Sequence, residues 1–224
     1  MRTLILFDID GTLLDTRGAG RRSFARAIRH IFGGQDDLAD VSFAGATDLD
    51  LFEKMALRFG RRATRDDCAL FFDILPGLLT EELQKEPPHL YPGVSDILED
   101  LSTQAHCTLG LVTGNIETCA RVKLQACNIH QHFVLGAFGH EHADRREIAR
   151  LARERAERSH RHDRCFLIGD TPSDIAAAHA IGAVSVAVAT GIYTAEQLAA
   201  AGAAHVWENL DAHAERARSI LLSA

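Results

Sequence analysis

Two aspartates, Asp8 and Asp10, follow directly on the apolar run Leu4–Phe7. The run is typical of a buried β-strand, and side chains alternate along a strand, so both carboxylates can face the same way if the extended conformation persists. Carboxylates at close range repel each other and need a shared proton or a cation. A hard divalent cation with oxygen ligands meets that need. The pattern predicts a metal-assisted site at the carboxyl end of this strand.

A second strand, Cys165–Ile168, also runs into carboxylates. Pro172 suits the first position of the helix that follows. Thr171 and Asp174 have the spacing of a capping box, so Asp174 has a structural role even without a metal. Asp170 lies before the helix and has no such role. It is therefore the candidate for a third oxygen ligand.

A third strand, Thr108–Val112, is followed by Thr113, Gly114 and Asn115, and a helix is expected from about Ile116. Free N–H groups at a helix start, together with a hydroxyl, form a site for an anion. An ordinary strand-to-helix turn with Asn115 as the N-cap is the alternative, because such caps are common.

Two arginines, Arg145 and Arg146, are expected in the first turn of another helix, between Asp144 and Glu147 at capping-box spacing. The helix dipole disfavours cations there, so an arginine at this place indicates a bound anion, and its planar fork suits phosphate. The alternative is a solvated basic helix, which is the better interpretation of the arginines further along it.

Short apolar runs rich in β-forming residues alternate with helical patterns along most of the chain. This alternation predicts an α/β fold, with a Rossmann-like parallel sheet covered by helices on both faces. The expected strands are Leu4–Phe7, Thr108–Val112, Phe133–Phe138, Cys165–Ile168, Val184–Ala189 and His205–Trp207.

One stretch interrupts the alternation. From about Thr16 to Leu90 the sequence shows only helical periodicity, without a convincing strand. This predicts an α-helical cap, residues 16–90, inserted into an α/β core made of residues 1–15 and 91–224. The expected cap helices are Ser23–Ile31, Leu49–Phe59, Asp66–Leu75 and Leu78–Lys85.

Charge and composition exclude several classes of partner. The 224 residues carry a formal net charge of −7, from 31 acidic and 24 basic residues. Nucleic acid and anionic membranes are therefore not expected as partners. The five cysteines are scattered without a CxxC pair, which argues against a disulfide framework and fits a reducing cytoplasm. No segment has the pattern of a signal peptide or a membrane span.

These motifs, in this order, resemble the haloacid dehalogenase-like hydrolase superfamily, most closely its phosphoglycolate phosphatase-like branch with an α-helical cap. The resemblance covers nearly the whole chain. It is carried by DIDGTLLDT at residues 8–16, LVTGN at 111–115 and GDTPSD at 169–174.

The resemblance implies roles for the aspartates. Asp8 is similar to the nucleophile that forms an aspartyl-phosphate, and Asp10 to the general acid and base. Asp8 and Asp170 would bind Mg²⁺ by their side chains, Asp10 by its backbone carbonyl, and Asp174 directly or through water. Mn²⁺ accepts the same oxygen ligands.

The resemblance also implies phosphate-binding residues, at Thr113, Gly114 and Asn115. The family's usual lysine between its second and fourth motifs is absent, because no lysine lies in residues 128–164. Arg145 is the expected substitute, with Arg146 in reserve. Lys123, two turns into the helix after LVTGN, is expected only to pack or to be solvated.

Asp10 separates phosphate-processing members of the superfamily from true dehalogenases, which lack an aspartate there. We therefore expect a phosphatase for a small phosphorylated metabolite, of the phosphoglycolate or sugar-phosphate type, as a monomer or homodimer. A phosphomutase on the same fold is an alternative, and so is a non-catalytic phosphate-binding protein.

The cap is expected to close over the site and to select the substrate. Its hinges should lie near Asp15–Thr16 and Leu90–Gly93. The turn 45–48 could point into the site, or could be a loop between helices with Thr47 or Asp48 as N-cap.

Overall fold

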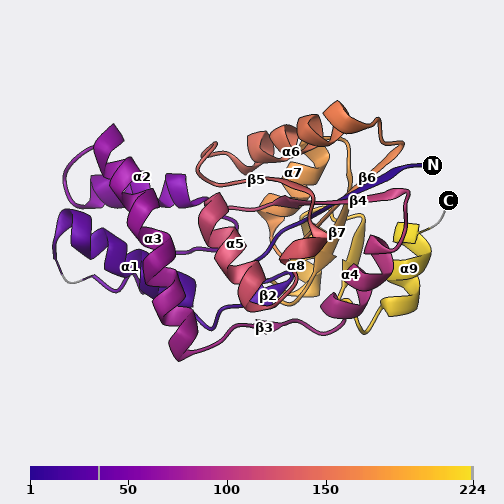
Figure 1. Ribbon diagram of the computed structural model, residues 1–224, viewed down its shortest axis with the longest axis horizontal. Helices are drawn as coiled ribbons and strands as arrows, with labels where there is room; N and C mark the ends of the chain where they lie inside the picture. The colour runs from indigo at the N-terminus through magenta and orange to yellow at the C-terminus, as the bar shows by residue number, and fades with distance from the viewer. Residues whose placement is uncertain (35, 223–224) are drawn as a thin grey trace.

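Parallel strands form the centre of the molecule in the computed structural model, which describes residues 1–34 and 36–222 (Figure 1). Within that part of the chain, six strands pair in parallel in the order β5-β4-β1-β6-β7-β8. The predicted α/β fold with a Rossmann-like sheet is confirmed. The strands are β1 (Thr3–Phe7), β4 (Cys107–Val112), β5 (Leu135–Ala137), β6 (Arg164–Gly169), β7 (Val184–Val188) and β8 (His205–Trp207).

Helices cover both faces of this sheet, with α6 and α7 on one face and α4 and α9 on the other (Figure 1). Strand β1 alternates between the two layers: Leu4 and Leu6 pack with α6 and α7, whereas Ile5 and Phe7 pack with α4 and α9. Because both faces are buried, the strand is a continuous apolar run. The helices outside the 16–90 segment are α4 (Val94–Ser102), α5 (Glu117–Ala126), α6 (Arg145–Ser159), α7 (Pro172–Ala180), α8 (Ala195–Ala200) and α9 (Ala214–Leu222).

Strand β1 stands where the strand order reverses. The chain continues to β4 and β5 on one side of it and to β6, β7 and β8 on the other. Phe7 pairs with Leu111 of β4 and with Ile168 of β6, so the carboxyl ends of the three strands are level. In open α/β sheets this edge, at the reversal point, is where ligands bind. The polar residues that follow these three strands are therefore brought together.

Helices α1 (Ala19–Phe32), α2 (Asp48–Arg58) and α3 (Arg65–Lys85) pack on one another beyond this edge (Figure 1). Aromatic rings form much of their core. The Phe71 ring centroid lies 4.4 Å from that of Phe52 and 4.9 Å from that of Phe24. A separate hydrophobic cluster thus holds these helices together, apart from the clusters beside the sheet.

The prediction of two helices in the last part of this segment is wrong, because α3 runs through Pro76 as one helix of 21 residues. Proline removes one backbone hydrogen bond and strains the turn before it. Leu75 and Leu79, on either side, are both buried in the shared apolar cluster. Their packing offsets the cost of the proline, which the local sequence pattern does not reveal.

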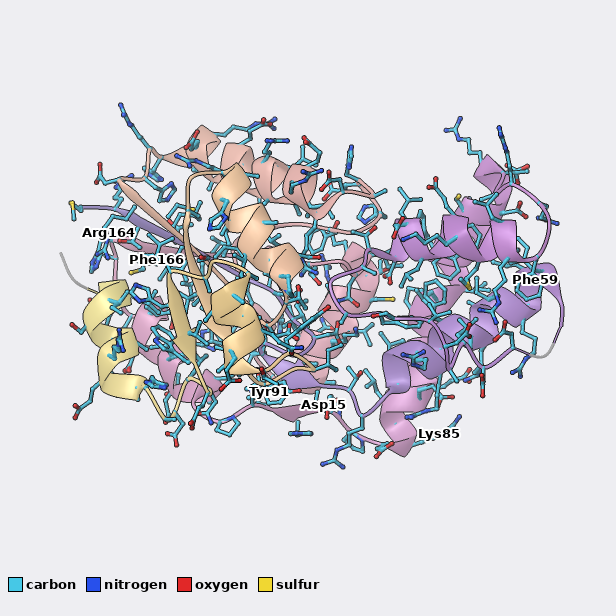
Figure 2. The ribbon with its side chains drawn as sticks, turned by 180° about the vertical axis from the view of Figure 1, so that it is seen from behind. Asp15, Phe59, Lys85, Tyr91, Arg164 and Phe166 are labelled. Atoms are coloured by element: carbon cyan, nitrogen blue, oxygen red, sulfur yellow. The ribbon has the colours of Figure 1, made fainter. Side chains whose placement is uncertain are left out.

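The two connections between the sheet and helices α1–α3 run side by side. They form a short antiparallel ribbon of β2 (Leu14–Asp15) and β3 (His89–Leu90), and Tyr91 N donates to Leu13 O at 3.0 Å. Figure 2 shows Asp15 and Tyr91 where the two parts of the molecule meet. The expectation of no strand up to Leu90 is wrong for the last two residues, because a strand of two residues is too short to show a period.

The sequence predicts no membrane-spanning segment, and the structure allows this to be examined for its helices. Among the residues that the structure describes, no helix combines the length and apolar character needed to span a bilayer.

Candidate active site

Three buried carboxylates meet at the edge of the sheet. Asp8 comes directly after β1, and Asp170 and Asp174 come from the turn between β6 and α7. Each offers an oxygen within 4.8 Å of the others. The structure thus brings together three of the four residues that the resemblance implies as metal ligands. The fourth, Asp10, lies two residues after Asp8, beyond the end of β1.

Gly11 makes room for this cluster. Its φ is 80°, a conformation that favours glycine, and a Cβ placed on it would lie 2.3 Å from Asp170 Oδ2. Thr12 Oγ1, next along the turn, donates to Asp170 Oδ1 at 3.2 Å. The turn after β1 therefore positions both the Asp8 carboxylate and the Asp170 carboxylate.

Arg145 is the cation of this cluster. It is buried at the start of α6, with Nη2 2.5 Å from Asp8 Oδ1 and Nε 2.9 Å from Asp174 Oδ1. Arg146, the reserve candidate, points away and pairs with Asp144 in an exposed position. The structure thus places the arginine expected to replace the family's lysine beside the nucleophile candidate.

The two predicted capping boxes have different outcomes. The box of Thr171 and Asp174 is confirmed, because each side chain accepts from the backbone N–H of the other. The box of Asp144 and Glu147 is wrong. The Asp144 side chain does cap α6, because it accepts a hydrogen bond from Arg146 N. The Glu147 side chain, however, pairs with Arg150 on the same helix and not with the backbone of Asp144.

Burial and neighbouring carboxylates raise the pKa values of two carboxyls of the cluster, Asp8 and Asp170. Burial, with Asp174 and Asp10 nearby, raises the pKa of Asp8 from its usual 3.8 to about 7, although Arg145 opposes the shift. Burial, together with Asp174 and Asp8, raises the pKa of Asp170 to about 8. One guanidinium therefore does not neutralise the cluster.

This donor set fits a hard divalent cation. All three side chains offer carboxylate oxygens, which Mg²⁺ prefers. Asp174 Oδ1 lies near Arg145 Nε without hydrogen-bond geometry, and no donor in the described part of the chain reaches it. A bound Mg²⁺ would supply the missing positive charge, held by Asp8 and Asp170 with Asp174 beside them.

The raised pKa values predict how stability depends on pH. In metal-free protein the folded state binds more protons than the unfolded state between the ordinary carboxyl pKa of 3.8 and the folded values of about 7 and 8. Stability therefore falls as pH rises through that range. We expect Mg²⁺ to raise the Tm much more at pH 8 than at pH 5, measured by calorimetry. An equal rise in Tm with Mg²⁺ at both pH values would contradict the view that the ionised cluster lacks positive charge.

Asp10 belongs to a second polar group, with Lys123 and Asn115. Lys123 Nζ lies 2.8 and 2.6 Å from the two Asp10 oxygens and donates to Asn115 Oδ1 at 2.6 Å. Asn115 Nδ2 donates to Asp10 Oδ2 at 2.7 Å and to Thr113 Oγ1 at 2.8 Å. Because the Asn115 amide is used inside the protein, its direct contact with a phosphoryl group stays a prediction.

The expectation for Lys123 is wrong: it is a buried partner of Asp10, with only 4% of its side chain exposed. Burial opposes its charge, but the ion pair and hydrogen bonds with Asp10 more than offset this and raise the pKa of Lys123. A signal was present in the sequence. Lys123 lies on the same helical face as Cys119, Ala120 and Leu124, which are all buried, so it interrupts an apolar stripe.

The start of α5 is occupied by a protein carboxylate. Asp48, at the start of α2, accepts from Ile116 N at 2.8 Å. Ile116, not Asn115, holds the N-cap position of α5. Burial is the main cause that raises the pKa of Asp48 to about 6, while Lys123 and the Ile116 hydrogen bond oppose it. The N–H group of this N-cap residue is therefore already used by a protein carboxylate, and binding of an anion by Thr113 and Gly114 stays a prediction.

The first residues of α2, with Thr47 before them, dock on the loops that follow the strands. Asp48 N donates to Gly114 O at 2.8 Å, and Leu49 N donates to Gly139 O at 3.3 Å. Thr47 caps α2 through Asp50 N, and its hydroxyl donates to Ala143 O at 3.1 Å. The turn 45–48 is expected from the sequence either to point into the site or to supply the N-cap of a helix. It does both, because Thr47 caps α2 and residues of the turn line the cavity beside the site.

Gly114 permits this docking, which gives a testable prediction. A Cβ on Gly114 would lie 2.0 Å from Ala46 O, so Gly114→Ala must push the loop away. We expect kcat/KM for phosphate esters to fall by about tenfold or more, because a small displacement of positioned groups is costly. The control is Gly77→Ala on α3, where a Cβ meets open space. An unchanged kcat/KM for Gly114→Ala would contradict the importance of docking.

A cavity of about 480 Å³ joins these groups. The turn after β1 and the loops after β4 and β6 line one end of it, and α1, α2 and α3 contribute to the other. Asp8, Asp10, Thr113 and Arg145 all border this space. The arrangement places a buried carboxylate, a second carboxylate with a paired amine, and a hydroxyl around one space.

Comparison with known proteins identifies the family. The model of the haloacid dehalogenase-like hydrolases matches residues 5–188, which is most of the chain. The chain therefore belongs to the haloacid dehalogenase-like hydrolase family, as the sequence motifs predict.

Individual relatives agree with this assignment. The chain is 28% identical over 210 residues to the probable phosphatase IndB of Dickeya dadantii (strain 3937), covering 90% of this chain and 87% of that one. A hydrolase from Pseudomonas syringae has a similar structure, with a TM-score of 0.74, 20% identity, and coverage of 98% and 99%. CbbY from Rhodobacter sphaeroides, in complex with phosphate, gives a TM-score of 0.72, 21% identity, and coverage of 95% and 96%.

Proposed function

We propose that this enzyme is a Mg²⁺-dependent phosphatase, which hydrolyses small phosphate monoesters through an aspartyl-phosphate on Asp8. The observation that carries the proposal is the buried cluster of Asp8, Asp170, Asp174 and Arg145 at the reversal point of the sheet. Family membership and a relative described as a probable phosphatase support it.

The first step is transfer of the phosphoryl group to the protein. An Asp8 oxygen attacks phosphorus, the bond from phosphorus to the ester oxygen breaks, and Asp10 donates a proton to the departing alkoxide. A Mg²⁺ bound at the cluster would offset the charge of the phosphoryl oxygens. Arg145 is placed to bind one of those oxygens, and the Thr113 hydroxyl and Gly114 N–H to bind others.

The second step returns the phosphoryl group to water. Asp10, now ionised, takes a proton from a water molecule that attacks phosphorus, and the bond to Asp8 breaks. Inorganic phosphate leaves and both carboxylates return to their starting states. Lys123 and Asn115 hold the Asp10 carboxylate from one side throughout, so that its position relative to the scissile bond is fixed.

Residues 16–90 act as a cap over this site in the proposal. Docking of the first residues of α2 on Gly114 and Gly139 closes the cavity, which excludes bulk water during transfer. The ribbon of β2 and β3 is the natural hinge, because both chain crossings run through it. Helices α1–α3 then determine which alcohol fits beyond the phosphoryl group.

The test is release of inorganic phosphate from a panel of phosphate monoesters with Mg²⁺ and, separately, with EDTA. We expect release with Mg²⁺, and a loss of about 10³-fold or more on chelation, because several kcal/mol of charge stabilisation disappear. Transfer of phosphate to a second sugar hydroxyl without release would instead indicate a phosphomutase. Binding of phosphate without turnover of any ester would indicate a non-catalytic protein.

A further inference from the structure

The cavity carries little positive charge beyond what the phosphoryl group needs. Among the described residues that line it, three side chains are cationic and five are carboxylates. A bound Mg²⁺ would bring the total close to neutral before any substrate enters. The cations are Arg21, Lys123 and Arg145, and the carboxylates are Asp8, Asp10, Asp15, Asp48 and Asp170.

Each of the three cations already has partners. Arg145 is held by Asp8 and its neighbour Asp174, and Lys123 by Asp10 and Asn115 as described above. Binding of a phosphoryl group beside Asp8 uses Arg145 in addition. A second anionic group further along the cavity would therefore depend on the remaining cation.

That remaining cation, Arg21 of α1, is turned toward the backbone of the loop after its own helix. Its Nη1 donates to the carbonyl oxygens of Leu38 and, at 2.8 Å, of Val41. Its guanidinium carbon also lies 4.5 Å from the centre of the Phe43 ring. Turning Arg21 to meet a substrate anion would break both hydrogen bonds. Leu38 O would keep Val41 N as a donor at 3.1 Å, but Val41 O would lose this donor, which is costly.

The end of the cavity away from Asp8 is apolar. Phe24 from α1, Leu51 from α2, and Leu75 and Leu79 from α3 line it, and all four are buried in the cluster that holds these helices together. Asp48, a carboxylate from α2, also lines the cavity; it is negatively charged and so would repel a substrate anion. A charged group here would lose its hydration without gaining a partner, whereas an apolar group would bury surface favourably.

We propose that the substrate is a phosphate monoester whose alcohol is uncharged and at least partly apolar. The inference rests on the proposed phosphatase function and narrows it. Substrates with a second anionic group, such as phosphoglycolate or a sugar bisphosphate, are poor, because the far end of the cavity is apolar and offers no free cation to that group among the described residues that line it. Of the two substrate types implied by the resemblance, this proposal excludes the phosphoglycolate type and keeps the sugar-phosphate type.

Three esters test the proposal, and separate comparisons among them test the effect of charge and the effect of apolar contact. Phosphoglycolate is compared with phosphoglycolamide, in which an uncharged amide replaces the carboxylate, and with benzyl phosphate. We expect kcat/KM for the two esters with an uncharged alcohol part to exceed that for phosphoglycolate by about tenfold or more, the size of effect that pocket contacts achieve. Phosphoglycolate equal to or better than its amide would overturn the proposal.

Binding to the Asp8→Asn variant keeps the test independent of turnover. The Kd of each ester, measured by calorimetry with Mg²⁺, should follow the same order as kcat/KM. If no ester releases phosphate from the unmodified enzyme, the proposed phosphatase function fails, while this binding order still supports or overturns the inference about the alcohol.

A pair of leucines on one helix provides the structural control. Leu75 and Leu83 are both buried on α3, but only Leu75 borders the cavity. Leu75→Ala should lower the preference for benzyl phosphate over phosphoglycolamide several-fold. Leu83→Ala should lower the Tm but leave that ratio unchanged. A ratio that changes equally in both variants, or in neither, would contradict the assignment of the apolar wall.

Discussion

Replacing Asp8 by asparagine should lower kcat for phosphate release by on the order of 10⁴-fold, because the amide cannot attack phosphorus. The change keeps the shape of the side chain and removes one of three clustered negative charges. Since burial and the neighbouring carboxylates raise the pKa of Asp8 to about 7, its ionisation destabilises the metal-free fold near neutral pH. We therefore expect the Tm of the metal-free variant at pH 8 to be equal to or above that of the unmodified protein.

Single-turnover phosphate release measures the expected loss of rate, and calorimetry on the same samples measures the expected Tm. Asp100→Asn is the matched control, because Asp100 pairs with Arg218 on the surface and does not line the cavity. It should leave kcat unchanged. An Asp8→Asn variant that retains more than about a tenth of the activity would show that Asp8 is not the nucleophile.

Replacing Lys123 by methionine should have the second largest effect. Methionine keeps the length and apolar part of the side chain but leaves Asp10 without its cation and Asn115 without its donor. We expect kcat for alkyl phosphates to fall by on the order of 10²-fold, the usual contribution of a positioned general acid. With 4-nitrophenyl phosphate, whose leaving group needs no proton, the loss in the first step should be much smaller.

This difference between leaving groups separates positioning of Asp10 from a merely structural role. Lys54→Met is the control, because Lys54 is an exposed lysine paired with Asp50. It should change neither rate. An equal loss on alkyl and 4-nitrophenyl esters in pre-steady-state measurements would show that Lys123 supports the fold and does not position Asp10.

Parts of the site that follow directly on strands could be predicted from the sequence. Asp8 and Asp170 each come immediately after a buried apolar run, and parallel strands bring such residues to one edge. Arg145 could also be inferred, because a cation in the first turn of a helix needs a reason to be there. In each case a local pattern and the sheet topology were sufficient.

Lys123 and Asp48 could not be placed in this way. Both depend on α5, whose residues pack partly against the sheet and partly against helices α1–α3. A helix with two buried faces has a weak amphipathic pattern, so the sequence shows at most that Lys123 interrupts an apolar stripe and does not show which residue it pairs with. The contacts of Lys123 with Asp10 and of Asp48 with Ile116 join residues far apart in the chain, and they depend on how the two parts dock.

The most direct test of the central claim is to find the phosphoryl group on the protein. The Asp10→Asn variant should accept phosphate from 4-nitrophenyl phosphate but hydrolyse it slowly, because no base activates water. The reaction is run in the presence of Mg²⁺, quenched with acid, and analysed by mass spectrometry of peptides. We predict one phosphoryl group per chain, on Asp8, and none when Mg²⁺ is left out. A burst of 4-nitrophenol without phosphorylated peptide, or phosphate on another residue, would contradict covalent catalysis by Asp8.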